Sequence, residues 1–187
     1  MKNKKFHFII VLAVPLIILL SLTVKPLWTM TSGEDISLLT VPVDPRDLLY
    51  GDYVTLRYEI EEVPKKKVTE ALLKKLEKKT TYKPTKVYGK LVQENQVFIL
   101  EELTDKKPSD ALYLTGRMYG YPYLDEDNIM ILNVDFNLER FFVPENTGTK
   151  LEELSRQGQL VAHIKVKNGY ALLRDIEGIE QNSPSEK

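Results

Sequence analysis

An uninterrupted apolar stretch near the N-terminus constrains this chain more than any other feature. Residues 6–24 read FHFIIVLAVPLIILLSLTV and carry no formal charge unless His7 is protonated. A helix of this length just spans a hydrocarbon core of about 30 Å at about 1.5 Å per residue. Three lysines lie within residues 1–5, and basic residues beside a span favour the cytoplasmic side. The pattern predicts a cytoplasmic N-terminus at 1–5, a transmembrane anchor at 6–24 and an extracytoplasmic remainder.

A cleaved secretory signal peptide is the competing interpretation, because it shares the basic start and the apolar centre. The small-residue cleavage site of the A-x-A type is missing from the residues that follow, LTVKPLW at 22–28. Pro15 is tolerable inside a membrane helix, and Trp28 suits an interfacial position at the outer surface. We therefore favour an uncleaved signal-anchor.

Residue counts exclude several kinds of chemistry. The 187 residues leave room for one domain besides the anchor, and with 43% hydrophobic and 28% charged residues that domain can bury a core. Cysteine is absent, which excludes disulfides, thiolate nucleophiles and thiolate zinc sites. His7 and His163 are the only histidines, so a histidine metal site or a Ser-His-Asp triad has little support. Because the net charge is only −1, we expect no nucleic-acid partner, and we also expect no cofactor and no metal.

Beyond the anchor the sequence has the pattern of antiparallel β structure. Residues 53–61 alternate between apolar and polar side chains, as in a half-buried strand, and residues 37–43 are a further strand candidate. The closing hairpin is joined through Lys167-Asn168-Gly169, and an Asn-Gly pair favours a tight type I′ turn. The predicted hairpins pair 86–93 with 97–103, 111–119 with 129–136, and 160–166 with 170–176.

Two short helices are expected in the same domain. Pro64 opens a lysine-rich segment, Lys65 to Lys79, whose apolar residues recur at helical spacing. A Thr149-x-x-Glu152 capping box opens the second helix, which Gly158 is suited to end. We predict an α+β fold, a mainly antiparallel β domain like a small barrel or sandwich, with these two helices and the transmembrane helix. Along the chain we expect a linker at 25–35, the domain at 36–177 and a flexible tail at 178–187.

A sequence motif follows the first strand candidate. Residues 51–58 read GDYVTLRY, with Gly51-Asp52-Tyr53, Leu56 and Tyr58 at characteristic spacing. Asp44-Pro45-Arg46-Asp47 precede it, and a second block, LERFFVPE, occupies 138–145. With these motifs, its total length and its closing hairpin, the chain resembles the GDYXXLXY family of uncharacterised bacterial membrane-anchored proteins over nearly its whole length.

The departures from the family pattern are small. Tyr50 stands where a basic residue is expected, Phe141 stands where tyrosine is more usual, and the lysine-rich segment lies outside the pattern. The resemblance implies an extracytoplasmic protein on a membrane anchor, often associated with multi-span membrane proteins. It implies no reaction, no cofactor and no catalytic residue.

Three roles are open for the motif residues. In the first, Arg46 and Arg140 form bidentate ion pairs with neighbouring carboxylates and lock the two blocks together. In the second, the blocks form a polar surface for a partner protein, because Arg, Tyr and Phe are favoured at such surfaces. In the third, Asp52 and Glu145 face each other at about 5–10 Å, as in two-carboxylate hydrolases. The residues concerned are Asp44, Arg46, Asp47, Gly51, Asp52, Tyr53, Leu56, Tyr58, Arg140, Phe142, Pro144 and Glu145.

The function we expect is that of a membrane-anchored accessory or interaction protein, acting outside the cytoplasmic membrane with an integral membrane partner. One alternative is a carboxylate-dependent cell-envelope hydrolase. The other is an anionic-surface-binding module acting through the Lys65–Lys79 helix. Residues 64–90 carry ten lysines against two glutamates, which suits lipid heads or cell-wall polymer as well as a solvated helix face.

Overall fold

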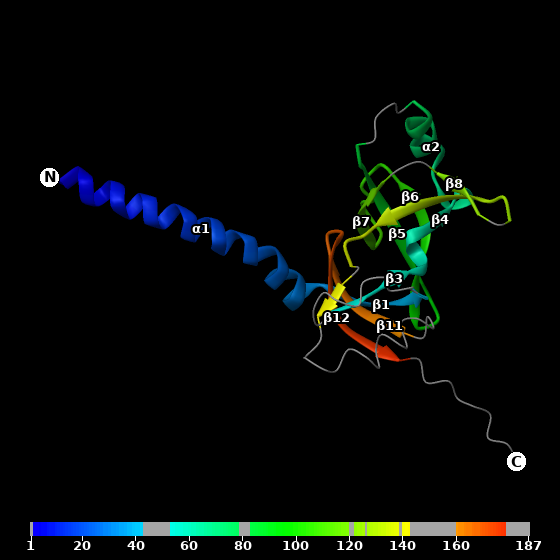
Figure 1. Cartoon of the computed structure of the whole chain (residues 1–187). Helices are drawn as coiled ribbons and strands as arrows, with labels where there is room; N and C mark the ends of the chain where they lie inside the picture. Colours follow the sequence, from blue (N-terminus) through cyan, green and yellow to red (C-terminus); the bar gives the residue numbers. More distant parts are fainter. Residues whose placement is uncertain are drawn as a thin grey trace, which may run out of the picture.

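A computed structural model shows a long N-terminal helix joined to a β-rich domain (Figure 1). The strand ladders are antiparallel, and the curled sheets form a nearly closed barrel and a half-barrel. The predicted α+β, mainly antiparallel fold is therefore confirmed. The second predicted helix of the domain, at 149–158, lies outside the described residues. The structure describes residues 2–42, 53–78, 83–119, 122–125, 127–138, 140–142 and 160–178.

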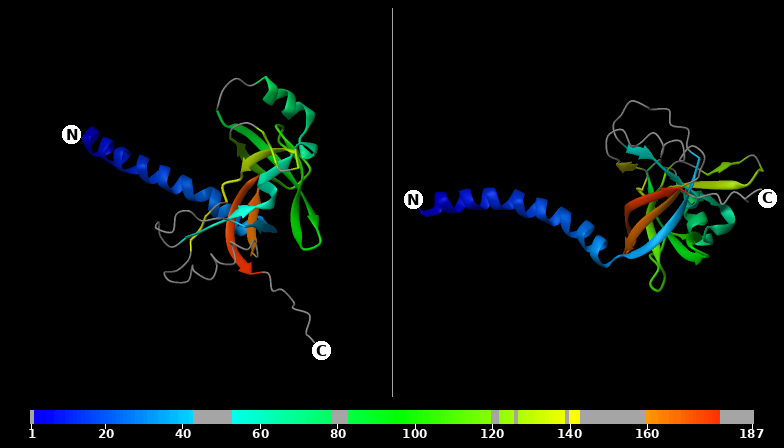
Figure 2. Two further views of the ribbon diagram at one scale, coloured as in Figure 1. Left: turned by 45° about the vertical axis from the view of Figure 1, so that its right-hand side comes forward. Right: turned by 90° about the horizontal axis from the view of Figure 1, so that it is seen from below.

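Helix α1 (Lys2–Ser32) continues past the predicted anchor. The part from His7 to Ser32 is long and apolar enough to cross a membrane. Its most apolar stretch has a mean hydropathy of 2.7, and none of that stretch is buried in the domain. Residues 25–32, which we expected in a linker, form its last turns. Pro26 lies within these turns and removes a backbone hydrogen bond, and Figure 2 shows the helix curving toward its C-terminal end.

One sheet follows directly from the helix, separated from it by Gly33 alone. Alternate residues of its two central strands are buried, as expected for strands with one face on a core. Its last two strands form the predicted closing hairpin, and the positive φ angles of Asn168 (50°) and Gly169 (75°) agree with the predicted turn. In spatial order the strands are β12 (Tyr170–Gly178), β11 (Leu160–Lys167), β1 (Glu34–Val41) and β3 (Arg57–Tyr58).

A larger sheet of six strands packs beside the first. Its first hairpin, β5 with β6, is as predicted. The second hairpin is only partly as predicted. Its strands, β7 and β9, pair only at their C-terminal ends, and residues expected in the loop between them form β8, which pairs with β9. The strands are β4 (Glu62–Pro64), β5 (Thr85–Glu94), β6 (Val97–Thr104), β7 (Tyr113–Met118), β8 (Tyr123–Leu124) and β9 (Met130–Asp135).

The prediction of one continuous strand at 53–61 is wrong. The chain forms β2 (Tyr53–Thr55), then β3, then a 3₁₀ turn η1 (Glu59–Glu61). Strand β2 pairs with β10 (Arg140–Phe142), whereas β3 pairs with β1. The alternating pattern survives the break because it reflects which side chains enter the core, and Leu56, Tyr58 and Ile60 do so.

The lysine-rich helix is shorter than predicted. Its first residues form a 3₁₀ turn, η2 (Lys65–Lys67), and the α-helix α2 runs only from Glu70 to Glu77. The chain is drawn out of helical geometry between them because Val68 bridges to Leu103 on β6 and the Thr69 N–H donates to the Leu103 carbonyl at 2.9 Å. Helix α2 is amphipathic, as its spacing predicts, and buries Leu72.

Both main sheets and α2 contribute to one hydrophobic core. Leu56 and Tyr58 of the sequence motif are part of this core. In extended chain, residues two positions apart point to the same side, so this spacing lets both enter the core. The largest fully buried side chains are Tyr58, Leu38, Leu56, Leu72, Leu103, Leu114, Leu132, Leu160 and Ile164.

The turn between β11 and β12 provides a test of how the two sheets are held together. The carbonyl of Gly169 accepts a hydrogen bond from the Thr115 N–H on β7 at 2.8 Å. A Cβ at Gly169 would overlap the Tyr113 ring, and its φ of +75° is unfavourable for any other residue. We expect Gly169→Ala to lower the free energy of unfolding by about 1–3 kcal/mol, measured by urea denaturation of the detergent-solubilised chain.

Asn168→Gly is the matched control for this prediction. It changes the neighbouring position of the same turn, where glycine accepts the positive φ without strain. We expect its effect to stay within about 0.5 kcal/mol. A Gly169→Ala variant as stable as the wild type would show that the turn is not held against β7.

Candidate functional site

The two motif blocks meet in space as a pair of strands. Strand β2 from the first block and β10 from the second pair antiparallel, with Thr55 opposite Arg140 and Tyr53 opposite Phe142. Segments more than eighty residues apart in the sequence are thus joined by backbone hydrogen bonds. We refer to this pair, β2 with β10, as the motif ribbon.

Tyr58 joins the two motif blocks within the core. Its side chain is fully buried, and its hydroxyl donates to the Leu138 carbonyl at 3.0 Å. Its backbone N–H donates to the Glu61 Oε2 at 3.1 Å. Burial, reinforced by the negative charge of Glu61, raises the pKa of Tyr58 far above its ordinary value. The hydroxyl therefore stays protonated and remains a donor to the residue that begins the second block.

Most of the residues predicted for the site lie outside the described residues. This holds for Asp44, Arg46, Asp47, Gly51, Asp52, Pro144 and Glu145. Tyr53, Arg140 and Phe142 are placed by their backbone, and Leu56 and Tyr58 are placed in the core. The ion pairs of the lock and the facing of Asp52 and Glu145 remain predictions. In the described part of the chain, no group of three or more His, Asp or Glu side chains is arranged to hold a metal ion.

A second polar cluster, which sequence reasoning missed, joins the end of α1 to β11. Lys165 donates to Asp35 Oδ2 at 2.7 Å and to the Gly33 carbonyl at 3.3 Å, while Lys167 donates to the Ser32 carbonyl at 3.1 Å. The carbonyls at a helix C-terminus carry partial negative charge, so ammonium groups are favourable there. We call this cluster the helix junction.

The helix junction also includes aromatic and acidic contacts. The Lys167 ammonium lies 4.7 Å from the centre of the Trp28 ring, and the Lys25 ammonium lies 4.3 Å from the centre of the Tyr170 ring. The hydrogen bond that Asp35 accepts from Lys165, together with the nearby positive charges, lowers the pKa of Asp35. Burial raises this pKa, but by less. Asp35 therefore carries its charge down to more acidic pH than an isolated aspartate.

The junction follows from strand register. Antiparallel pairing of β1 with β11 places Asp35 opposite Lys165, so an acidic residue just after the helix meets a basic residue on the returning strand. The signal available in the sequence was the pair of basic residues, Lys165 and Lys167, alternating along a strand toward the turn. This signal could not be interpreted without knowing which residues of β1 and β11 lie opposite each other.

Tyr58→Phe tests whether the core hydrogen bond stabilises the motif ribbon. Removing the hydroxyl leaves the Leu138 carbonyl without its buried donor, and we expect the free energy of unfolding to fall by about 1–3 kcal/mol. Urea denaturation followed by circular dichroism provides the measurement.

The chain offers a matched control in Tyr113→Phe. The Tyr113 hydroxyl is also buried, but it has no hydrogen-bond partner among the described residues. Removing it should leave stability unchanged or raise it, because an unpaired buried polar group is lost. If both variants lose the same stability, the bond from Tyr58 to Leu138 has no special role.

Comparison with known proteins yields one match. The model of the GDYXXLXY protein family matches residues 15–176. No curated protein and no solved structure matches the chain. The matched range begins within α1 and ends within β12, so it contains the helix junction, both strands of the motif ribbon and Tyr58. Because the match covers well over half of its residues, this chain belongs to the GDYXXLXY family.

Proposed function

We propose that this chain is a single-pass membrane protein whose domain lies outside the cytoplasmic membrane and binds an integral membrane partner without catalysing a reaction. The observation that carries the proposal is the helix junction. Helix α1 is long and apolar enough to span a membrane. Its last residue, Ser32, is bonded to β11 through Lys167, and Gly33 directly after it is bonded through Lys165. An anchor fixed in this way holds the domain at the membrane surface in one orientation, where a membrane partner can reach it.

Gly33 strengthens this coupling between anchor and domain. A Cβ at this position would overlap the Thr29 carbonyl of the helix and approach the Val166 carbonyl of β11 at 3.2 Å. The helix and the returning strand therefore approach each other more closely than any other residue permits. A flexible tether would require no such fit, whereas a domain with a defined orientation does.

The motif ribbon is the surface that we assign to the partner. Its two short strands form a sheet of their own, apart from the two main sheets. The sequence around them is rich in arginine, aromatic and acidic residues, which are suited to a polar contact with a protein.

The position of α2 does not favour a role in membrane binding. Figures 1 and 2 place α2 at the end of the domain remote from α1. Two of its lysines already have acidic neighbours, with Lys75 at 3.0 Å from Asp105 and Lys74 at 3.6 Å from Glu70. A solvated helix face explains these contacts.

Single-cysteine labelling tests the proposed topology, because the chain contains no cysteine of its own. In spheroplasts, a membrane-impermeant maleimide is expected to label Lys106→Cys, an exposed position in the domain, and not Asn3→Cys. After membrane disruption both should be labelled. Labelling of Asn3→Cys in intact spheroplasts would reverse the topology, and its absence from the mature protein after disruption would show cleavage.

Crosslinking in cells followed by affinity purification tests the partner surface. The full-length tagged chain is compared with Arg46→Ala and Asp52→Ala, and with Lys74→Ala on α2 as a control of similar size. We expect the wild type and Lys74→Ala to recover one membrane protein that both motif variants lose while accumulating normally.

Two results would contradict this proposal. If the motif variants accumulate and recover the same partner, the charged residues that precede the motif ribbon are not part of the contact surface. If the wild type recovers no membrane protein, the accessory role is wrong. Failure of both variants to accumulate would favour the lock, the structural role of the motif.

A further inference from the structure

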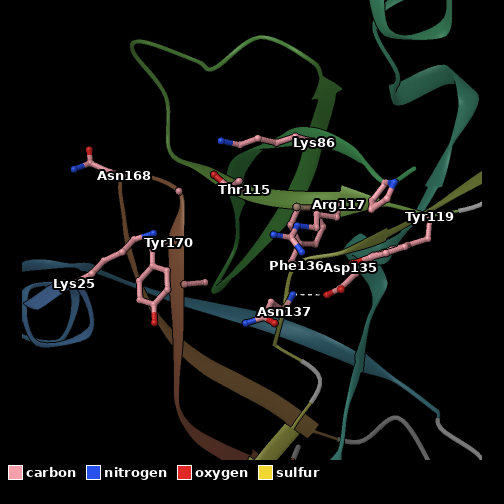
Figure 3. Close-up of a pocket in the computed structure, with 14 residues that line it drawn as sticks. Lys25, Lys86, Thr115, Arg117, Tyr119, Asp135, Phe136, Asn137, Asn168 and Tyr170 are labelled. Atoms are coloured by element: carbon pink, nitrogen blue, oxygen red, sulfur yellow. Dashed lines mark hydrogen bonds between the residues drawn. The ribbon is translucent and has the colours of Figure 1, made fainter. Parts of the chain in front are cut away.

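A polar cleft lies beside the helix junction. It has a volume of about 680 Å³ and lies between the end of α1, the turn of the β11–β12 hairpin and strands of the larger sheet. Figure 3 shows Lys25 approaching from the helix side and Lys86 and Arg117 from the sheet side, with Thr115 between them. Lys25, Lys86 and Arg117 are far apart in the sequence, and only the fold brings them to one cleft.

The charges around the cleft favour an anion. Three basic residues, Lys25, Lys86 and Arg117, and one acidic residue, Asp135, line it. The Lys25 and Lys86 ammonium groups lie over tyrosine rings. In the described part of the chain, none of the three basic groups forms a salt bridge. The carboxylate of Asp135 is engaged within its own turn, because its Oδ1 accepts a hydrogen bond from the Asn137 backbone N–H.

The lining offers neutral hydrogen-bond donors as well. Asn137 and Asn168, which carry side-chain amides, and Thr115, which carries a hydroxyl, are among the residues that line the cleft. Arginine pairs with phosphate through two parallel hydrogen bonds, lysine adds a compact charge, and amides and hydroxyls bind the remaining oxygens. This combination of donors is suited to a phosphate group.

The position of the cleft along α1 indicates where the phosphate comes from. Lys25 directly follows Val24, the last residue of the apolar stretch. About 10 Å of helix separates Lys25 from Ser32, at 1.5 Å per residue, yet Lys25 contacts Tyr170 because the hairpin turn extends back along the helix. With α1 in a membrane, the cleft lies at the level of the lipid headgroups. A basic cleft at that level is suited to the phosphate of an anionic lipid.

We propose that this cleft binds the phosphate of an anionic lipid headgroup, held by Lys25, Lys86 and Arg117. The inference rests on the proposed membrane position of α1 and adds a ligand to it. A bound headgroup places one negatively charged lipid between the helix and the larger sheet. It thereby ties the orientation of the domain to the lipid that surrounds the anchor.

Binding to the purified full-length chain in neutral detergent tests this site. The probes are short-chain phosphatidylglycerol, short-chain phosphatidylcholine and inorganic phosphate, each titrated and followed by microscale thermophoresis. We expect phosphatidylglycerol to bind most tightly. The double variant Lys86→Gln/Arg117→Gln should weaken its binding about tenfold or more, because two charge-assisted contacts are lost.

The double variant Lys66→Gln/Lys74→Gln is the control, since it removes the same charge at exposed positions outside the cleft. It should bind phosphatidylglycerol as the wild type does. Equal binding by the cleft variant and the wild type, or equal loss in both double variants, would overturn the site. Equal affinity for inorganic phosphate would show a soluble anion to be the ligand and would overturn the assignment to lipid.

Lys25→Gln provides an independent measurement, because it changes the helix side of the cleft and leaves the sheet unchanged. It should also weaken phosphatidylglycerol binding, and unchanged affinity would contradict the part assigned to α1. These titrations use no partner and no cells. Failure here therefore leaves the crosslinking result intact, and failure of the partner experiment leaves the lipid titration intact.

Discussion

The antiparallel pairing of β1 with β11 is the constraint on which the rest of the structure depends. Strand β1 leaves the membrane-type helix after a single glycine, so whatever fixes β1 also fixes the direction of α1. Pairing with β11 places Asp35 opposite Lys165 and brings Lys167 to the last carbonyls of the helix. The same strand pairs on its other edge with β3. The helix, the closing hairpin and the sequence motif are therefore positioned by one strand, and shifting its register by one residue would turn its buried side chains outward.

The motif contributes through a change of sheet. Between Thr55 and Arg57 the chain passes from the motif ribbon to the sheet that contains β1, while Leu56 and Tyr58 remain in the core. Tyr58 then reaches the start of the second block through its hydroxyl. A leucine and a tyrosine two residues apart are suited to this because both must enter the same core, and only the tyrosine carries a donor. The spacing that defines the family thus has a structural reason in the described residues.

Sequence reasoning was most successful where a pattern depends on local geometry. The Asn-Gly turn, the β5–β6 hairpin and the buried side of residues 56–60 follow from φ preferences and from the pleat, which neighbouring residues determine. It failed where a distant segment decides the outcome. Val68 leaves the predicted lysine-rich helix because Leu103 pairs with it, and β8 forms in a predicted loop because β9 has a free edge there. The family blocks indicated a site at the motif, whereas the helix junction and the cleft gave no signal that could be interpreted before the register was known.

The number of lysines in a sequence segment does not show which lysines are placed to bind the membrane surface. Residues 64–90 hold ten lysines, yet those on α2 lie away from the anchor and include residues paired with Glu70 and Asp105. Among the lysines of that segment that the structure describes, Lys86 alone lines the cleft, where it joins Lys25 and Arg117 from other parts of the chain. Attraction between exposed charges falls off over about 8 Å at physiological salt, so a charged helix remote from the membrane exerts little force on it. The three basic groups of the cleft come from separate elements and form no ion pairs among the described residues. They lie next to the end of the apolar helix, where a headgroup phosphate would lie. Position relative to the anchor, more than local charge density, decides which basic residues are suited to the membrane surface.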